Sequence, residues 1–277
     1  MKPAAPDLTV RRWEAGRWSE SPDAVVMEEP LQLSLNGAPL SVVMRTPGGD
    51  VELALGLFYA EGIITSLDDV SVVRMSAESA ESEGGVKVEA DLMESNQVDV
   101  HLAGPPRRRP ERSMLASSAC GVCGAVMIED LKRGLARLEP GPSFDASLLP
   151  GLVDKLRAGQ GVFDRTGALH AAGLFTASGD LVCAREDVGR HNAVDKVVGR
   201  MLLDRALPAS DRVLLVSGRA GYEIVQKSIA AGIAVVAAVG APSSLAVELA
   251  ADRGITLCGF VRGGRLNVYT ELWRVLA

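Results

Sequence analysis

Apolar and polar residues alternate along the first hundred residues in the way that half-buried strands require. The alternation covers 31–35 and returns over 40–44, and the Asn36-Gly37 pair between them predicts a tight hairpin turn. Other patterns predict a helix over 51–61 and strands over 70–75, 86–92 and 98–102. Residues 1 to about 24 are polar and contain prolines, so they predict a loosely held arm.

In the second half of the chain, strand and helix signals follow one another. Strands are predicted over 169–175 and 181–185, and helices over 148–157 and around 194–202. Continuous apolar runs, typical of strands buried on both faces, then occur three times. They lie at 213–216, 234–239 and 255–260, with helical patterns at about 222–231 and 243–252 between them. This βαβαβ order predicts a parallel sheet with right-handed crossovers.

The sharpest change in composition is the Pro-Pro-Arg-Arg-Arg-Pro stretch at 105–110. It divides the chain into a β-rich N-terminal subdomain over 1–110, a segment over 111–140, and an α/β subdomain over 141–277. The middle segment holds a CxxC loop and an expected helix, which carries its apolar face on Ile128, Leu131, Leu135 and Leu138. The predicted fold class is α/β, with an α+β N-terminal part.

Composition and charge narrow the class of protein. Of 277 residues, 47% are apolar and 4% aromatic, so aliphatic side chains fill the core of an ordinary globular protein. A net charge of −6 argues against broad binding to nucleic acid. No apolar run has the roughly 18 to 20 residues that a membrane-spanning helix needs, and the first residues lack the apolar core of a signal peptide. We therefore expect a cytoplasmic protein with reduced thiols and no membrane partner.

Cys120 and Cys123 form the CxxC pair, which is typical of reactive thiols or of half a zinc site. The pair follows the arginines at 107–109 and precedes a predicted helix, and both features favour the thiolate form. A structural zinc ion usually has four ligands. The other cysteines, Cys183 and Cys258, are far away in strand-like apolar contexts, where thiols are usually inert. Reactive sulfur is the favoured interpretation, and no metal site is predicted.

The loops that follow the three buried strands share glycines and arginines. They cover 217–221, 240–244 and 260–265. Ligands of open α/β sheets bind at this carboxyl edge, where helix N-termini and arginines bind phosphate. Arg219, Arg262 and Arg265 therefore predict a nucleotide site. The alternative is that these are tight turns whose arginines are solvated.

A dense polar segment at 186–196 surrounds an expected helix start. His191 and Arg190 could contact an anion there, whereas Asp187 or Asn192 could equally cap the helix. His170, at the start of a strand, fits the description of a buried core histidine.

Together these segments resemble the FdhD family, the accessory sulfurtransferases that formate dehydrogenases require. The resemblance covers about residues 28–270. Its motifs are Glu28-Glu29-Pro30-Leu31, Ala119-Cys120-Gly121-Val122-Cys123-Gly124, Thr166-Gly167-Ala168-Leu169-His170-Ala171-Ala172, Glu186-Asp187-Val188-Gly189-Arg190-His191-Asn192-Ala193-Val194-Asp195-Lys196 and Ser217-Gly218-Arg219. The string from Asp187 to Lys196 is far more specific than CxxC alone.

The resemblance implies sulfur transfer from a cysteine desulfurase to the molybdenum bis(molybdopterin guanine dinucleotide) cofactor, bound as cargo, for the client formate dehydrogenase. Cys120 matches the cysteine that carries the persulfide, and Cys123 matches the second cysteine of the loop. The cofactor-binding stretch of the family matches Phe260, Val261, Arg262, Gly263, Gly264 and Arg265. A cytidine-deaminase-like fold is implied for the later part of the chain, and a homodimer is compatible with the family.

We expect Arg219, His191 and Asp187 to line the same crevice as that stretch, because the diphosphates of a guanine dinucleotide suit strand-end arginines.

Two alternative functions remain. A non-enzymatic chaperone would hold the cofactor without passing sulfur, and it would survive replacement of Cys120. A deaminase needs His-x-Glu and Pro-Cys-x-x-Cys. His170-Ala171-Ala172 lacks the carboxylate and no proline precedes Cys120, so deaminase chemistry is disfavoured.

Overall fold

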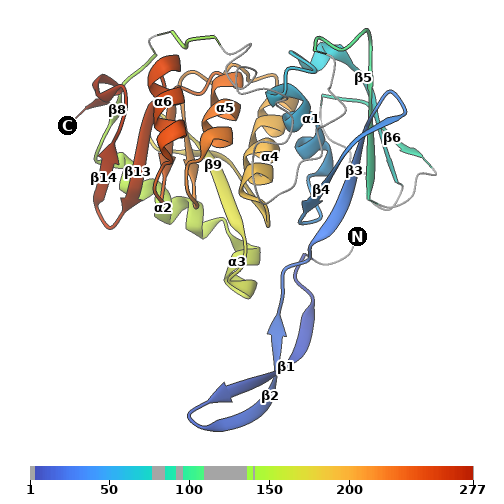
Figure 1. The fold of residues 1–277 in the computed structure, drawn as a ribbon, viewed down its shortest axis with the longest axis vertical. Helices are drawn as coiled ribbons and strands as arrows, with labels where there is room; N and C mark the ends of the chain where they lie inside the picture. The colour runs from blue at the N-terminus through green and yellow to red at the C-terminus, as the bar shows by residue number, and fades with distance from the viewer. Residues whose placement is uncertain (1–3, 77–84, 92–95, 109–135, 140, 277) are drawn as a thin grey trace.

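The computed structural model describes residues 4–76, 85–91, 96–108, 136–139 and 141–276. Cys120, Cys123 and most of the helix expected after them lie outside these ranges, so the statements about them stay predictions. Within the described ranges the strands form two large sheets and two small strand pairs (Figure 1).

The first large sheet has the strand order β4-β3-β7-β5-β6, and helix α1 (Asp50–Ala60) packs on it. Its strands are β3 (Glu29–Leu35), β4 (Ala38–Arg45), β5 (Val70–Ser76), β6 (Val88–Asp91) and β7 (Gln97–Leu102). The 3-10 helix η1 (Leu67–Asp69) leads into β5. Asn36 and Gly37 have φ of 51° and 81°, as the hairpin turn between β3 and β4 requires. The predicted strands and hairpin are confirmed.

The second large sheet has the order β10-β9-β11-β12-β13-β14. Its strands are β9 (His170–Thr176), β10 (Leu181–Asp187), β11 (Arg212–Val216), β12 (Val235–Ala238), β13 (Thr256–Arg262) and β14 (Arg265–Val268). Strand β12 pairs in parallel with both β11 and β13, whereas the other neighbours are antiparallel. The predicted βαβαβ unit is therefore present, and the α/β fold class is confirmed.

Helices cover both faces of this sheet (Figure 1). One face carries α4 (Arg190–Leu203), α5 (Tyr222–Ala230) and α6 (Ser244–Arg253). The other face carries α2 (Leu148–Ala158), which the short α3 (Gly161–Thr166) follows. Leu214 belongs to the first core and its neighbour Leu215 to the second, so each continuous apolar strand serves two helix layers. This is the layered arrangement that the resemblance implied.

Two glycines allow α1, from the N-terminal part of the chain, to cross α4 in close contact. A Cβ on Gly56 would lie 1.9 Å from the carbonyl oxygen of Asp195, and one on Gly199 would lie 1.9 Å from that of Glu52. Only glycine allows the two helix backbones to approach this closely. The N-terminal helix is thereby held against the helix that begins at the carboxyl edge of the second sheet.

Three predictions from local sequence were wrong. Residues 7–24 form an antiparallel hairpin, β1 (Asp7–Glu14) and β2 (Arg17–Ala24), which projects from the body (Figure 1). Residues 260–265 are not a loop, because β13 runs to Arg262 and turns at Gly263-Gly264 into β14. Leu138 lies in a non-helical stretch and donates its N–H to the Arg253 carbonyl, so no helix extends to it. The remaining elements are β8 (Phe144–Asp145), β15 (Val275–Leu276) and η3 (Leu272–Arg274).

Candidate functional site

The turns that follow β11 and β12 are hydrogen-bonded to each other at the carboxyl edge of the sheet. The N–H of Gly240 donates to the carbonyl of Gly218 at 2.9 Å, and the N–H of Phe260 donates to the carbonyl of Gly240 at 3.1 Å. A Cβ on Gly240 would lie only 3.0 Å from both the Gly218 carbonyl oxygen and Cγ of Arg219. Glycine at 240 is therefore needed for the two turns to meet beneath the Arg219 side chain.

Basic side chains gather at the Gly218 turn. A Cβ on Gly218 would lie 3.3 Å from Nδ1 of His170 and 4.0 Å from Cδ of Arg190. Burial and the Arg190 charge lower the pKa of His170, against a smaller opposing effect of Asp187. Arg190 is partly buried, yet it makes no hydrogen bond or ion pair with any described residue. An unpaired guanidinium held in this position is suited to bind an anion.

The N-terminus of α4 adds to this arrangement. The helix begins at Arg190 after an extended N-cap residue, Gly189, and no side chain caps its free N–H groups. Such N–H groups and the helix dipole attract anions. We call the group formed by Arg190, His170, His191 and the Gly218 turn the anion cradle.

His191 is also tied to α5. Its Nδ1 lies 3.0 Å from Oε2 of Glu223, and both side chains are mostly buried. Burial, then the charges of Arg190 and Lys227, lower the pKa of His191 to about 3. Burial raises the pKa of Glu223 to about 7, although Lys227 opposes that change. Because the imidazole is neutral near pH 7, this close contact is not an ion pair.

A pocket of about 570 Å³ opens beside the anion cradle. Most of its wall is apolar, whereas His170 and Ser217 lie on the sheet side and the polar residues Asp154, Arg157 and Gln160 on the helix side. Its other lining residues come from α2, α3 and the ends of three strands: Val153, Leu156, Phe163, Gly167, Ala168, Leu169, Val188 and Val239. A mostly apolar wall with a few polar groups is typical of sites for small organic molecules.

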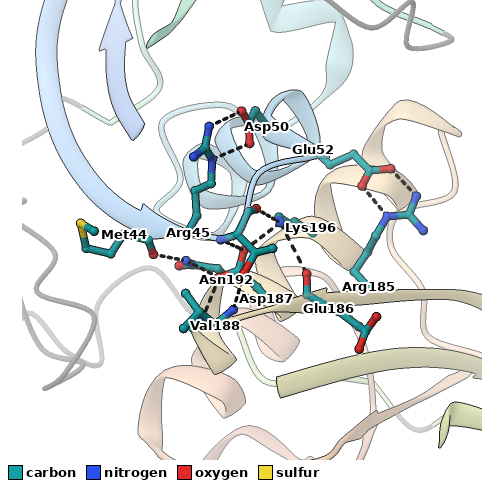
Figure 2. A network of polar contacts seen from close by, with 12 residues as sticks. Met44, Arg45, Asp50, Glu52, Arg185, Glu186, Asp187, Val188, Asn192 and Lys196 are labelled. Atoms are coloured by element: carbon teal, nitrogen blue, oxygen red, sulfur yellow. Dashed lines mark hydrogen bonds and ion pairs between the residues drawn. The ribbon is translucent and has the colours of Figure 1, made fainter. Parts of the chain in front are cut away.

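Asp187 comes three residues before Arg190, and its side chain takes part in a network of polar contacts (Figure 2). It is fully buried, and four donors use its carboxylate: the N–H groups of Thr46 and Gly189, Nδ2 of Asn192, and Nζ of Lys196 at 2.7 Å. Two donors on each oxygen leave no free acceptor site for a ligand. In this structure Asp187 anchors the start of α4 to Thr46, and a direct contact with cofactor stays an untested prediction.

Further polar contacts connect the N-terminal part of the chain with β10 and α4 (Figure 2). Together with the contacts of Asp187, we call them the seam. Arg45 binds Asp50 through two hydrogen bonds of 2.9 and 2.8 Å, and Arg185 of β10 binds Glu52 of α1. Nδ2 of Asn192 also donates to the carbonyl of Met44. The segment that carries the most specific sequence string therefore builds the junction between the two parts of the chain.

The other residues predicted to bind cofactor are spread along the sheet edge. Arg219 is exposed above the Gly240 turn, and Phe260 lies beside it with a positive φ of 54°. Arg262 and Arg265 face each other across the β13–β14 hairpin, exposed together with Gly263 and Gly264. Val261 is buried in the core. None of these residues lines the pocket.

The sequence pattern did not single out Glu223 or assign a function to His170. Both come from the tertiary structure, because His170 starts β9 and Glu223 starts α5 immediately after the 217–221 turn. The remaining cysteines fit the expectation of inert thiols. Burial raises the pKa of Cys183 to about 11 and that of Cys258 to about 12.

Within the described ranges, no three His, Cys, Asp or Glu side chains lie close enough together to hold a metal ion. None of the helices in those ranges is long and apolar enough to cross a membrane.

Comparison with known proteins identifies the relatives of this chain. Residues 26–276 match the model of the FdhD/NarQ family. A protein of Streptomyces avermitilis, named sulfur carrier protein FdhD, is 48% identical, and the alignment covers 96% of this chain and 94% of that protein. A protein of the same name from Sulfolobus acidocaldarius is 42% identical over 97% of both chains. A crystal structure from Desulfotalea psychrophila, described as a formate dehydrogenase accessory protein, superposes with a TM-score of 0.77 at 23% identity, covering 99% of this chain and 100% of that one.

Proposed function

The chain belongs to the FdhD/NarQ family, and we propose that it is a sulfur carrier that serves formate dehydrogenase. The Cys120 thiolate attacks the terminal sulfur of a cysteine desulfurase persulfide, which releases the desulfurase thiolate and leaves a persulfide on Cys120. The molybdenum bis(molybdopterin guanine dinucleotide) cofactor, which the chain holds as cargo, then accepts that sulfur: two electrons from the reduced cofactor cleave the S–S bond, and Cys120 leaves as the thiolate. The support for the sulfur step is the CxxC sequence together with the names of the relatives.

The single structural observation that supports cofactor binding is the unpaired guanidinium of Arg190 in the anion cradle. A diphosphate placed there would accept hydrogen bonds from Arg190, from the first N–H groups of α4 and from the histidines. The adjoining pocket of about 570 Å³ would then take the guanine ring, since it is open beside His170 and Ser217 and has apolar walls.

Calorimetric titration with guanosine diphosphate tests the binding site. Arg190→Ala should weaken binding by roughly ten- to a hundredfold, which corresponds to the loss of one charged hydrogen-bonded contact of about 1.5 to 3 kcal/mol. Arg17→Ala, on the exposed β1–β2 hairpin, is the matched control and should bind like the unmodified chain. Unchanged affinity of Arg190→Ala would contradict the cradle.

The same titration compares the cradle with the three arginines predicted from the strand-end loops. If Arg262→Ala or Arg265→Ala weakens binding as much as Arg190→Ala does, the diphosphate extends along the β13–β14 hairpin. If only Arg190→Ala and Arg219→Ala have an effect, the site ends at the Gly240 turn.

Intact mass spectrometry after incubation with a cysteine desulfurase and cysteine tests the sulfur step. We expect an added mass of about 32 Da, one sulfur atom, on the Cys120 peptide. Cys120→Ala should abolish support of the client formate dehydrogenase while guanosine diphosphate still binds. A Cys120→Ala variant that fully supports the client would instead favour a chaperone that holds cofactor without passing sulfur.

A further inference from the structure

The hairpin of β1 and β2 projects beyond α3, away from both large sheets (Figure 1). Every residue from 11 to 20 is exposed, so the outer half of the hairpin is covered by no other described part of the chain. Its strands meet in the Ala15-Gly16 turn, where both residues have a positive φ. A two-stranded hairpin is only marginally stable in water unless another surface packs on it. The tip therefore has the geometry of a docking element.

Two tryptophans stand opposite each other beside this turn. Trp13 pairs with Trp18 in the strand register, and their ring centroids lie 5.2 Å apart. They are 57% and 60% exposed. The guanidinium carbon of Arg11 lies 5.3 Å from the centre of the Trp18 ring. Tryptophan and arginine carry much of the binding energy at protein interfaces, so this group is typical of a surface that a protein partner covers.

The tip is also basic within an acidic protein. Residues 11–18 contain three arginines and a single glutamate, for a net charge of +2, whereas the whole chain has a net charge of −6. Arg11 lies on the same face as the tryptophans, and Arg12 lies on the opposite face, because side chains alternate along a strand. Positive charge on both faces complements a cleft that encloses the tip, with apolar walls for the tryptophans and carboxylates at its rim.

The base of the hairpin is fixed to the wall of the pocket described above. Strand β2 contacts α3, and Arg165 of that helix donates to the carbonyl of Ala5 at 2.9 Å. Phe163 of the same short helix lines the pocket, and its N–H donates to the Glu186 carboxylate at 3.1 Å. A protein that binds the hairpin is therefore attached to the helix that forms part of the pocket wall.

We propose that the β1–β2 hairpin docks the client formate dehydrogenase, through a cleft of that enzyme with apolar walls and an acidic rim. This inference rests on the proposed function, because the client is the enzyme for which the cargo in the pocket is prepared. The cysteine desulfurase passes only a sulfur atom and needs no access to the pocket. The attachment of the hairpin to the pocket wall therefore favours the client over the desulfurase.

Biolayer interferometry of the full chain on immobilised, cofactor-free formate dehydrogenase tests the proposal. Changing both tryptophans, Trp13→Ala with Trp18→Ala, should weaken binding about thirtyfold or more, the loss of at least one interface hot spot. Arg12→Glu leaves the tryptophan pair in place and should slow association about tenfold at low salt, with a smaller effect at high salt. Trp273→Ala, at a 47% exposed tryptophan near the C-terminus, is the matched control and should bind like the unmodified chain.

Two assays on the same double variant identify the protein that the hairpin binds. The variant should still bind guanosine diphosphate and still gain sulfur on Cys120 from the desulfurase, as the unmodified chain does. Loss of sulfur loading together with normal client binding would overturn the inference in favour of the desulfurase. Sedimentation that shows a dimer of the unmodified chain, separated into monomers by the double change while client binding persists, would overturn it in favour of a second copy.

The inference is also overturned if the unmodified chain does not bind the client, or if the double variant and Arg12→Glu bind it as the unmodified chain does. Should the tryptophan variant fail to fold, Arg12→Glu decides by its association rate and salt dependence. The proposed function fails differently: the unmodified chain itself then neither gains the sulfur mass nor binds guanosine diphosphate. The two failures are therefore distinguishable.

Discussion

Replacing Asp187 by alanine removes the acceptor at the centre of the seam between the two parts of the molecule. The carboxylate is fully buried and accepts from the N–H groups of Thr46 at 3.2 Å and Gly189 at 2.8 Å. It also accepts from Asn192 and from the ammonium group of Lys196, whose side chain is 3% exposed. Asp187→Ala would leave that ammonium group without a counter-ion and two backbone donors without a partner.

The size of the effect follows from this geometry. Breaking a buried ion pair by removing one partner costs about 3 to 5 kcal/mol, because an uncompensated charge stays in the interior. Lys196 retains only carbonyl acceptors, Thr46 at 2.9 Å and Glu186 at 3.5 Å, which do not neutralise it. We therefore expect Asp187→Ala to lower the free energy of unfolding by about 3 to 5 kcal/mol, a large share of the roughly 5 to 15 kcal/mol of an ordinary domain.

Urea unfolding, followed by circular dichroism and by tryptophan fluorescence, measures the loss, and coincident transitions check two-state behaviour. Asp23→Ala, at an exposed aspartate of the β1–β2 hairpin, is the control and should change stability by less than about 0.5 kcal/mol. Adding Lys196→Met to Asp187→Ala should cost less than the sum of the two single changes, because no charge is then left unpaired.

A loss below about 1 kcal/mol for Asp187→Ala, or strict additivity in the double variant, would refute this account of the seam. A second comparison addresses the sequence-based hypothesis that Asp187 binds the cofactor. If folded Asp187→Asn binds guanosine diphosphate like the unmodified chain, its importance is structural. If it folds normally and loses binding, the residue contacts the ligand.

Three other predictions follow from packing and burial. Gly199→Ala should destabilise the protein by about 1 to 3 kcal/mol or more in urea unfolding, since its Cβ would lie 1.9 Å from a backbone oxygen of α1. Gly151→Ala is the control: it lies in open space on α2 and should be neutral or stabilise the protein by up to about 1 kcal/mol. Because burial raises the pKa of Glu223 from 4.5 to about 7, stability should fall as pH rises from about 4.5 to about 7. The full change is on the order of 3 kcal/mol, and Glu223→Gln should flatten the profile; an unaltered profile would contradict the raised pKa. Cys183 and Cys258, with thiol pKa values of about 11 and about 12, should stay unmodified by a thiol reagent in the folded protein near neutral pH and react after denaturation.

Local sequence determined most of the elements. The alternation over 31–35 and 40–44 and the Asn36-Gly37 turn yielded β3 and β4, because side-chain period and turn geometry are properties of a few consecutive residues. The continuous apolar runs yielded β11, β12 and β13, because a strand between two helix layers needs apolar residues on both faces. The resemblance of the motifs to FdhD was confirmed by the family match over residues 26–276.

Only the tertiary structure decided what the polar residues of those motifs do. The sequence allowed two interpretations of Asp187, as a helix cap or as a ligand of an anion site. In the structure its carboxylate is buried and fully hydrogen-bonded, and one of its four donors is Thr46 from the distant β4–α1 connection. Residues 260–265 carry the glycines and arginines of a binding loop. They form the end of a hairpin, because β13 pairs with β14 there. The cradle of Arg190, His170 and His191 with Glu223 joins three segments of chain. A pattern along the sequence records the residue type and its local period, whereas burial and partnership depend on which distant segments pack beside it.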